Sequence, residues 1–588
     1  MSADPTNAAP SGSKVALVVL VALVVLSPWP FGSAHLRTTQ AIAVVSLATA
    51  LGSFLWDGWH RQLQLPPRAI LWPLLGLWML AVFQLIPLPE ALHHALAPGS
   101  AAVWHPDVPA AAAVLGPGPH PISLYPEATG RWLAFATAVI ALALTAAPAL
   151  RERRLLLRAS IAVVAGAVLV AVYGFVARLV FGNELFGVWS VPTVAPFGPF
   201  VSKNHFAGYV ELAALLAVGL ATGLTDEARR GPGWLSWIES RRAKWIVVTW
   251  GVSFILVLAV PVSLSRGGVV SLSAGLLVFA ALRLWARGPS SLRPRGLAAV
   301  LAVVFLAVGT ITASLPAEAR ARVLTLVGVT SEQSGAYRIG VWRDSLHLIA
   351  SSPWVGSGLG VYEDALPRFK TVAGDYRVQR AENDYVEFLA DGGAVGGLLL
   401  TSLASFLLVC GLRAPISPWT GCLQRGVRAG GLAGLVAMGV HSGFDFNLHI
   451  PSNALSCITL AALVSSAGGA NRPERAPSAA ARRRVLLMAG VLAATAVVAL
   501  RTPWAERRWH PSLLKRAAAG PPAGLRWTSL EGEVAAHLRR RPTDSSAWVI
   551  LAWCRGPSSR LEAAAFATWA VQLDPGHGEL RRAAARHH

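Results

Sequence analysis

Charged side chains are scarce in this chain. Only 14% of its 588 residues are Asp, Glu, Lys or Arg, whereas 54% are hydrophobic, and the mean hydropathy is positive. Soluble domains of ordinary composition carry about 25% charged residues. The shortage of charge therefore excludes a soluble multidomain protein and indicates a polytopic membrane protein.

Cysteines and metal-binding motifs are also few. The four cysteines, Cys410, Cys422, Cys457 and Cys554, fall in predicted spans or in loops on opposite sides of the membrane, so they offer no structural disulfide. The chain has no CxxC, HExxH, Walker or GxGxxG motif in a supporting context, and no cluster of metal ligands. We therefore expect neither a metal ion nor another cofactor.

Apolar runs near the ~20 residues that span a bilayer follow one another along most of the chain. They predict an all-α, polytopic membrane fold with roughly 12–13 transmembrane helices, which begin near Val15, Thr39, Ala69, Arg131, Ala159, His205, Trp245, Val269, Gly296, Gly393, Ala429, Pro451 and Val485. The first run, behind Lys14, also fits a cleaved secretory signal. No small-residue cleavage site follows it, which favours a retained anchor.

The basic residues predict the orientation of these helices. They gather in alternate loops, which the positive-inside rule assigns to the cytoplasm. The net charge of +21 is then explained by the basic residues that orient the helices in the membrane, and it does not indicate nucleic-acid binding. The predicted order is a cytoplasmic segment 1–14, nine helices in 15–315, a large extracytoplasmic loop 316–392, four helices in 393–500 and an extracytoplasmic tail 501–588.

The tail is expected to form a small helical unit. Its segments 546–553 and 562–575 resemble one tetratricopeptide-like pair of helices. A single pair cannot bury its apolar face alone. We therefore expect the tail to pack on the rest of the chain or on a protein partner.

Two short polar motifs are predicted at the outer ends of spans. Lys203, Asn204 and His205 open one span, with Glu211 deeper in the same helix. An ionisable residue at that depth usually faces a cavity or a partner, although anchoring at the interface explains the motif equally well. The second motif, Ser265-Arg266-Gly267-Gly268, places an arginine against the positive-inside bias, and its glycines allow close approach of a ligand. A snorkelling anchor is the alternative for Arg266.

Two longer polar segments are predicted on the same side. In the large loop, Arg338, Trp342 and Arg343 combine planar guanidinium donors with an aromatic surface, which suits an anionic sugar-phosphate substrate. The alternative is a solvated cationic loop. The last segment, 441–453, brings hydrogen-bonding side chains into an apolar hairpin. Helix capping explains only part of it.

Taken in order, these motifs resemble the O-antigen ligase family. The matching pieces are Lys203 to Gly208, Ser265 to Gly268, Arg338-x-x-x-Trp342, Pro353-x-x-Gly356-x-Gly358, Asn383-Asp384-Tyr385 through Gly393, and Asp445 to Pro451. Each piece alone is weak, but their order, spacing and common side make the set specific. The resemblance covers about residues 200–470.

The resemblance implies a glycosyltransferase of the bacterial inner membrane whose active site faces the periplasm. Such an enzyme moves a glycan from an undecaprenyl-diphosphate carrier to lipid A-core or to a growing polysaccharide. By this resemblance Arg266 and one of the pair Arg338 and Arg343 bind the diphosphate. Because all three arginines are predicted on the outer face against the charge bias, we expect all three to hold it. The remaining residues predicted to bind substrate are Lys203, Asn204, His205, Glu211, Trp342, Arg377, Arg380, Asn383, Tyr385, His441, Asp445, Asn447 and His449.

The chain departs from the family pattern at one position. Where family members have His-Asn, it has Glu382-Asn383. Either Glu382 accepts the proton of the acceptor or orients it, or that role has moved to His205, His441 or His449. Positive charge nearby would keep Glu382 ionised and weaken it as a base.

Several functions stay open from the sequence. An O-antigen ligase is preferred to a polysaccharide polymerase. A transporter of the same lipid-linked sugar would place its ionisable groups near the membrane midplane, whereas these motifs cluster at one surface. A scaffold acting through the tail would tolerate loss of Arg266 but not of the tail.

Overall fold

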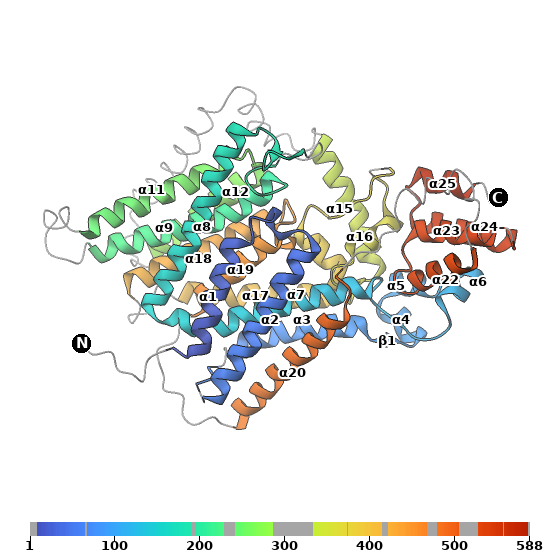
Figure 1. Ribbon diagram of the computed structural model, residues 1–588, viewed down its shortest axis with the longest axis horizontal. Coiled ribbons are helices and arrows are strands. Elements are labelled where there is room, and N and C mark those ends of the chain that lie inside the picture. Colours follow the sequence, from blue (N-terminus) through green and yellow to red (C-terminus); the bar gives the residue numbers. More distant parts are fainter. Residues whose placement is uncertain are drawn as a thin grey trace. The chain divides into compact units, whose positions relative to one another are not determined.

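The computed structural model covers the whole chain, and the structure describes residues 9–60, 62–64, 68–190, 196–228, 241–285, 333–372, 374–413, 421–466, 479–504, 527–556 and 558–585. These residues are mostly helical (Figure 1), which confirms the predicted all-α class. The long helices are α1 (Ser11–Leu26), α2 (Leu36–Trp59), α3 (Arg68–Leu85), α7 (Pro126–Ala146), α8 (Arg153–Val180), α9 (Lys203–Ala228), α11 (Arg241–Val262), α12 (Arg266–Trp285), α15 (Gln333–Ser351), α17 (Asp384–Arg413), α18 (Cys422–His441), α19 (Pro451–Ser466) and α20 (Ala479–Arg501).

Shorter elements lie in the connections and the tail. They are α4 (Glu90–Leu96), α5 (Pro98–Trp104), α6 (Pro109–Leu115), α16 (Tyr362–Ala365), α22 (Trp527–Leu538), α23 (Ser545–Arg555), α24 (Arg560–Leu573), α25 (Gly578–Ala584) and the 3-10 turns η2 (Phe31–Ser33), η3 (Ala149–Arg151), η6 (Leu366–Phe369) and η8 (Asn447–His449). Two antiparallel pairs of two-residue strands complete the described structure. They are β1 (Pro87–Leu88) with β2 (His120–Pro121), where Leu88 faces His120, and β3 (Glu184–Leu185) with β4 (Trp189–Ser190), where Leu185 faces Trp189.

The membrane class predicted from hydropathy is confirmed. Among the described residues, seven helices are long and apolar enough to cross a membrane, namely α2, α7, α8, α9, α11, α12 and α17, and α1, α3 and α20 contain shorter apolar stretches. The predicted run near Gly296 lies outside the described residues. Each of the other predicted runs falls on a described helix.

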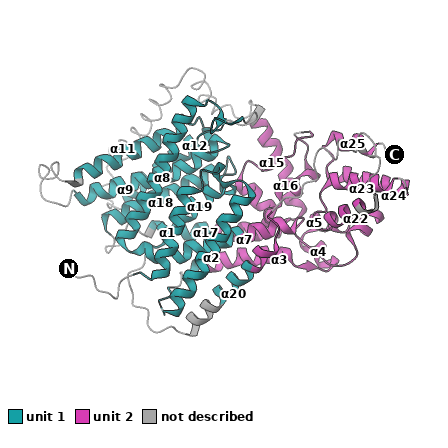
Figure 2. Cartoon of the chain, viewed as in Figure 1, with its two compact units in different colours: residues 1–70, 135–327, 403–496 teal, residues 71–134, 328–402, 497–588 magenta. Residues whose placement is uncertain are grey.

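The chain divides into two compact units, each assembled from three separate segments (Figure 2). Unit 1 comprises residues 1–70, 135–327 and 403–496, and unit 2 comprises residues 71–134, 328–402 and 497–588. The predicted polar motifs are thereby divided as well. Those around residues 203–211, 265–268 and 441–453 belong to unit 1, and those of the large loop belong to unit 2.

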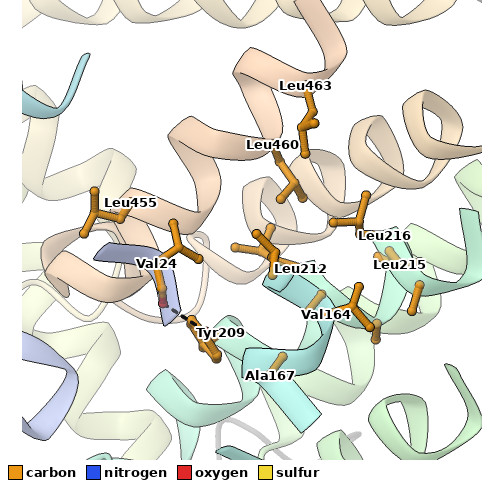
Figure 3. Close-up of a cluster of buried hydrophobic side chains, with 14 of the residues drawn as sticks. Val24, Val164, Ala167, Tyr209, Leu212, Leu215, Leu216, Leu455, Leu460 and Leu463 are labelled. Carbon is orange, nitrogen blue, oxygen red and sulfur yellow. Dashed lines mark hydrogen bonds between the residues drawn. The ribbon is translucent and has the colours of Figure 1, made fainter. Parts of the chain in front are cut away.

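Helix α9 is the centre of unit 1. It contacts α8, α11, α12, α18 and α19, and nearly all of its side chains are buried. Figure 3 shows Leu212, Leu215 and Leu216 of α9 among side chains of α8 and α19. The hydroxyl of Tyr209 donates to Val24 O of α1 at 3.1 Å. A buried hydroxyl without a partner would cost about 1–3 kcal/mol, so this bond fixes where α1 crosses α9.

Glycines bring α9 and α18 into backbone contact. A Cβ added at Gly219 would lie 2.4 Å from Gly426 O, and one added at Gly430 would lie 2.3 Å from Leu215 O. The glycines are spaced four residues apart on each helix, with Gly219 and Gly223 on α9 and Gly426 and Gly430 on α18. This spacing allows the close approach, and such packing holds helices together in lipid. The fixed contact positions the N-terminal end of α9 and the C-terminal end of α18, where polar motifs of unit 1 lie.

The glycine series of the large loop has a structural role in unit 2. Helix α17 is interrupted at Gly393, whose φ is 61° and ψ −165°, and the segment Pro353–Gly358 binds at this break. Ser357 N–H donates to Ala390 O, and Ala394 N–H donates to Pro353 O. A Cβ at Gly356 would lie 2.3 Å from Asp391 O. Only glycine fits this approach, so the series joins the loop to α17.

The tail packs on two segments of unit 2. Helices α22 and α24 contact α6, and α24 also contacts η6. The centre of this interface is Arg541, which is 2% exposed. Its Nε donates to Asp364 Oδ1 at 2.7 Å, and its guanidinium lies 4.6 Å from the ring centroid of Tyr125. Burial by itself lowers the pKa of Arg541, but the attraction of Asp364 outweighs it and the pKa is raised.

Four histidines lie together in the segment that contains α4, α5 and β2. The ring centroids of His93 and His105 are 5.7 Å apart, and those of His105 and His120 are 5.0 Å apart. His93 is fully buried, with Nε2 3.1 Å from Ser100 Oγ. Burial, and then the neighbouring histidines, lower the pKa of His93 to about 4.

This histidine should make the protein sensitive to acid. An unfolded histidine has a pKa near ~6.5, so the unfolded chain binds the proton first, and stability falls as the pH drops from about 6.5 to about 4. The complete loss corresponds to about 3 kcal/mol. His93→Gln, which can still bond Ser100, should reduce the difference in apparent melting temperature between pH 7.5 and pH 4.5. An equal difference in variant and parent would contradict this prediction.

Candidate functional site

Three predicted motifs of unit 1 converge at the N-termini of α9 and α12. The α12 helix begins at Arg266 after a turn in which Leu264 has a φ of 61°. Ser265 caps this helix, because its Oγ accepts the N–H of Gly268 at 3.1 Å. The same Oγ donates to Asn204 Oδ1 of α9 at 2.9 Å. The turn that presents Arg266 is therefore tied to the first residues of α9.

A buried carboxylate links three helices close to this turn. Glu211 of α9 accepts a hydrogen bond from Ser271 Oγ of α12 at 2.5 Å, and its other oxygen lies 3.1 Å from His441 Nδ1 of α18. The side chains of Glu211 and His441 are both 0% exposed. A Cβ at Gly267 would lie 3.1 Å from His441 Nε2. The imidazole therefore lies between Glu211 and the residue that follows Arg266.

The predicted segment 441–453 packs against the start of α9. Asp445 Oδ1 lies 3.5 Å from His205 Nε2, and the ring of Phe446 packs edge-on against that of His205. Asn453 Nδ2 donates to His205 O at 3.0 Å and to Asn447 Oδ1 at 2.9 Å. Asp445 and Asn447 thus help to hold the segment 441–453 against α9.

Other predicted residues of unit 1 lie at the edge of this cluster. Arg266, Lys203 and His449 are partly exposed. A Cβ added at Gly208 would lie 2.3 Å from Asn447 Oδ1. A glycine is therefore required at position 208, because the segment 441–453 approaches α9 too closely there for a side chain.

In unit 2, the structure brings Arg338 and Glu382 together. Arg338 Nη2 donates to Glu382 Oε2 at 3.0 Å, and both side chains are about one quarter exposed. Trp342, one turn further along α15, donates from Nε1 to Ala381 O at 2.8 Å. Glu382 has a φ of 55°, a left-handed conformation that is unusual for glutamate. Strained backbone of this kind clusters at functional sites.

Arg343 points in another direction from Arg338. The two residues are separated by five positions, which on an α-helix corresponds to about 140° around the axis. Arg343 is exposed, whereas Arg338 is partly buried against Glu382. The two arginines thus lie on different faces of α15 and do not form one clamp there.

Three other predicted residues of the loop have side chains with structural partners. Arg377 pairs with Glu363 at 3.0 Å and with Asp364 at 2.7 Å, the carboxylate that also binds Arg541. Arg380 Nη1 donates to Glu387 Oε1 at 2.7 Å. Asn383 caps α17, because its Oδ1 accepts the N–H of Tyr385 at 3.0 Å. Tyr385 itself is exposed.

One buried polar residue outside the predicted motifs, Gln84, supports the loop. Gln84 of α3 is 0% exposed, and it donates to Val355 O at 2.6 Å and to Asp391 O at 2.9 Å. Its Oε1 accepts the N–H of Leu359 at 2.9 Å. A single amide in an otherwise apolar run is costly in a membrane protein, which is the signal that could have identified Gln84. Ser271 gives no such signal, because serine is common in spanning helices.

Within the described ranges, no group of three or more His, Cys, Asp or Glu residues could hold a metal ion. The polar cluster of unit 1 includes the carboxylate of Glu211 and the imidazole of His441, and that of unit 2 includes the guanidinium of Arg338 and the carboxylate of Glu382. Guanidinium groups bind phosphate through planar, bidentate hydrogen bonds.

The fold and these sites define a multi-pass α-helical membrane protein with two polar clusters. Residues 251–401 match the model of the family described as O-antigen ligase. This match confirms the resemblance seen in the motifs and includes Arg266, Arg338, Arg343 and Glu382. Residues 251–401 are therefore similar to the O-antigen ligase family. A search of curated proteins finds no match.

Proposed function

We propose that the protein is a glycosyltransferase of the bacterial inner membrane that acts as an O-antigen ligase. It would move a glycan from undecaprenyl diphosphate to lipid A-core on the periplasmic side. The observation that carries this proposal is the O-antigen ligase match over residues 251–401, which contains the pair formed by Arg338 and Glu382.

The proposed reaction is a displacement at the anomeric carbon. The acceptor hydroxyl oxygen attacks this carbon, the bond to the diphosphate oxygen breaks, and the carrier leaves as undecaprenyl diphosphate. In this proposal guanidinium groups, Arg266 and Arg338 among them, stabilise the negative charge that develops on the diphosphate. The hydroxyl proton goes to the carboxylate of Glu382. Because fixed guanidinium groups supply the charge stabilisation, we expect transfer to persist in EDTA.

The glycan profile of a deletion strain tests this proposal. Loss of a ligase leaves complete polysaccharide on its carrier, with none on lipid A-core. Loss of a polymerase instead leaves single repeat units attached to the acceptor. Complementation with the parent gene should restore attachment. A normal surface polysaccharide in the deletion strain would overturn the proposal.

The proposed side of the membrane can be tested with introduced cysteines. Tyr376 of the large loop is 70% exposed, and Leu561 of the tail is 87% exposed. In a variant that lacks the four native cysteines, Tyr376→Cys and Leu561→Cys should both react with a membrane-impermeant thiol reagent in intact spheroplasts. Labelling of either position only after lysis would contradict a periplasmic location.

A further inference from the structure

The contact among α9, α12 and α18 is unusual because it is built from ionisable groups inside a helix bundle. Both oxygens of Glu211 are engaged, one by Ser271 and one by His441. All three side chains are fully buried. Ionisable residues at such positions are costly and usually serve a function.

The packing of the helices does not require this contact. Gly219, Gly426 and Gly430 already bring α9 and α18 into backbone contact, and apolar side chains of α9 fill the space around it. Replacing a buried ionic group by well-packed apolar residues is often neutral or stabilising. The polar contact therefore does something that apolar residues could not.

The position of the Glu211–His441 contact beside the Arg266 turn indicates the role of this contact. The carboxylate of Glu211 holds one edge of the His441 ring, and the other edge lies against Gly267, where a Cβ would be 3.1 Å from Nε2 and 3.2 Å from Cδ2. Ser271, five residues after Arg266 in α12, binds the same carboxylate. Ring and helix are thus fixed together beside the residue that follows Arg266.

We propose that Glu211 and His441 are positioning residues for Arg266. Glu211 fixes the orientation of the His441 ring, and the ring supports the backbone at Gly267, so that the guanidinium of Arg266 points in one direction before the substrate arrives. This inference rests on the proposed role of Arg266 in binding the diphosphate. Preorganised donors contribute more to stabilising developing charge than mobile ones.

A double-mutant cycle tests whether His441 acts through Arg266. His441→Asn retains a donor for Glu211 but lacks the ring edge that contacts Gly267. It should lower kcat/KM for the lipid-linked donor roughly 10-fold or more, the scale of a lost supporting contact. In the background of Arg266→Lys, which keeps the charge and a residual rate, the same change should have little further effect. Ser273→Ala is the matched control and should leave transfer unchanged, because among the described residues Ser273 bonds only to Val269 O of its own helix.

The outcomes separate this inference from the proposed function. Losses that multiply in the double variant would show that His441 acts independently of Arg266, and would overturn the positioning role alone. Normal kinetics of Arg266→Lys and Arg266→Ala would instead remove Arg266 from the site, and the inference would fail with it. If His441→Asn does not accumulate in the membrane, Glu211→Gln replaces it, since this change keeps the shape of the side chain. It should show the same dependence on Arg266, and independence would again overturn the proposal.

Discussion

Arg266→Ala is expected to reduce glycan transfer roughly 100-fold or more in a reconstituted assay with a lipid-linked donor. Removal of one preorganised donor to a developing negative charge costs catalysis of this order. Arg266→Lys should recover only a small part of the rate, because an ammonium group cannot make the planar, bidentate contact. Arg338→Ala is expected to cause a loss of the same order, and Arg343→Ala a smaller one, because Arg343 is exposed on another face of α15.

The structure supplies a control and a ranking for these variants. Arg178 lies exposed in the last turn of α8, where its guanidinium bonds to Asn183 of the adjoining loop. Arg178→Ala should transfer glycan normally at the same protein level. Arg338 is partly buried and paired with Glu382, whereas Arg343 is exposed on another face of α15. A larger loss for Arg338 than for Arg343 would fit this geometry, and near-normal transfer by Arg266→Ala would remove Arg266 from the site.

Glu382→Gln is expected to lower the rate of transfer roughly 100-fold or more, the scale of a general-base contribution. The change retains the shape of the side chain but removes the carboxylate that accepts the proton and pairs with Arg338. Glu382→His should keep partial activity with an altered pH dependence, because imidazole titrates near neutrality. The pH–rate profiles of the parent and both variants provide the measurement.

A second loop carboxylate controls for the loss of an ion pair. Glu363 pairs with Arg377 at 3.0 Å, so Glu363→Gln also breaks a carboxylate–arginine contact in unit 2. It should change transfer much less than Glu382→Gln. If Glu382→Gln transfers glycan normally, Glu382 has no acid–base role, and His205, His441 and His449 are the next residues to test.

The proposed site could be predicted from the sequence only in part. The sequence indicates Arg266, Glu211 and His441 as separate candidates, because each is a polar group in an apolar segment or at a predicted outer position. Their mutual contacts were not predictable, since Glu211 and His441 are 230 positions apart. The pairing of Arg338 with Glu382 likewise spans 44 positions and depends on how the loop folds back on α15.

The structure gives a structural role to several residues that the sequence predicts for the functional site. Arg377 joins Asp364 and thereby the tail residue Arg541. Gly356 belongs to the family pattern in the sequence, and the close approach of Asp391 beside the break of α17 at Gly393 explains why a glycine is needed there. Such contacts arise from backbone approaches between distant segments, which no local pattern reports.

The sequence by itself determined the membrane class, the places of the helices and the order of the polar motifs. These properties are local, because about 20 successive apolar residues suffice to span a bilayer whatever surrounds them. Only the tertiary structure decided which polar groups meet. Glu211 meets Ser271 and His441 because the glycines of α9 and α18 fix the approach of these helices, and the tail binds Asp364 because its own apolar face must be covered.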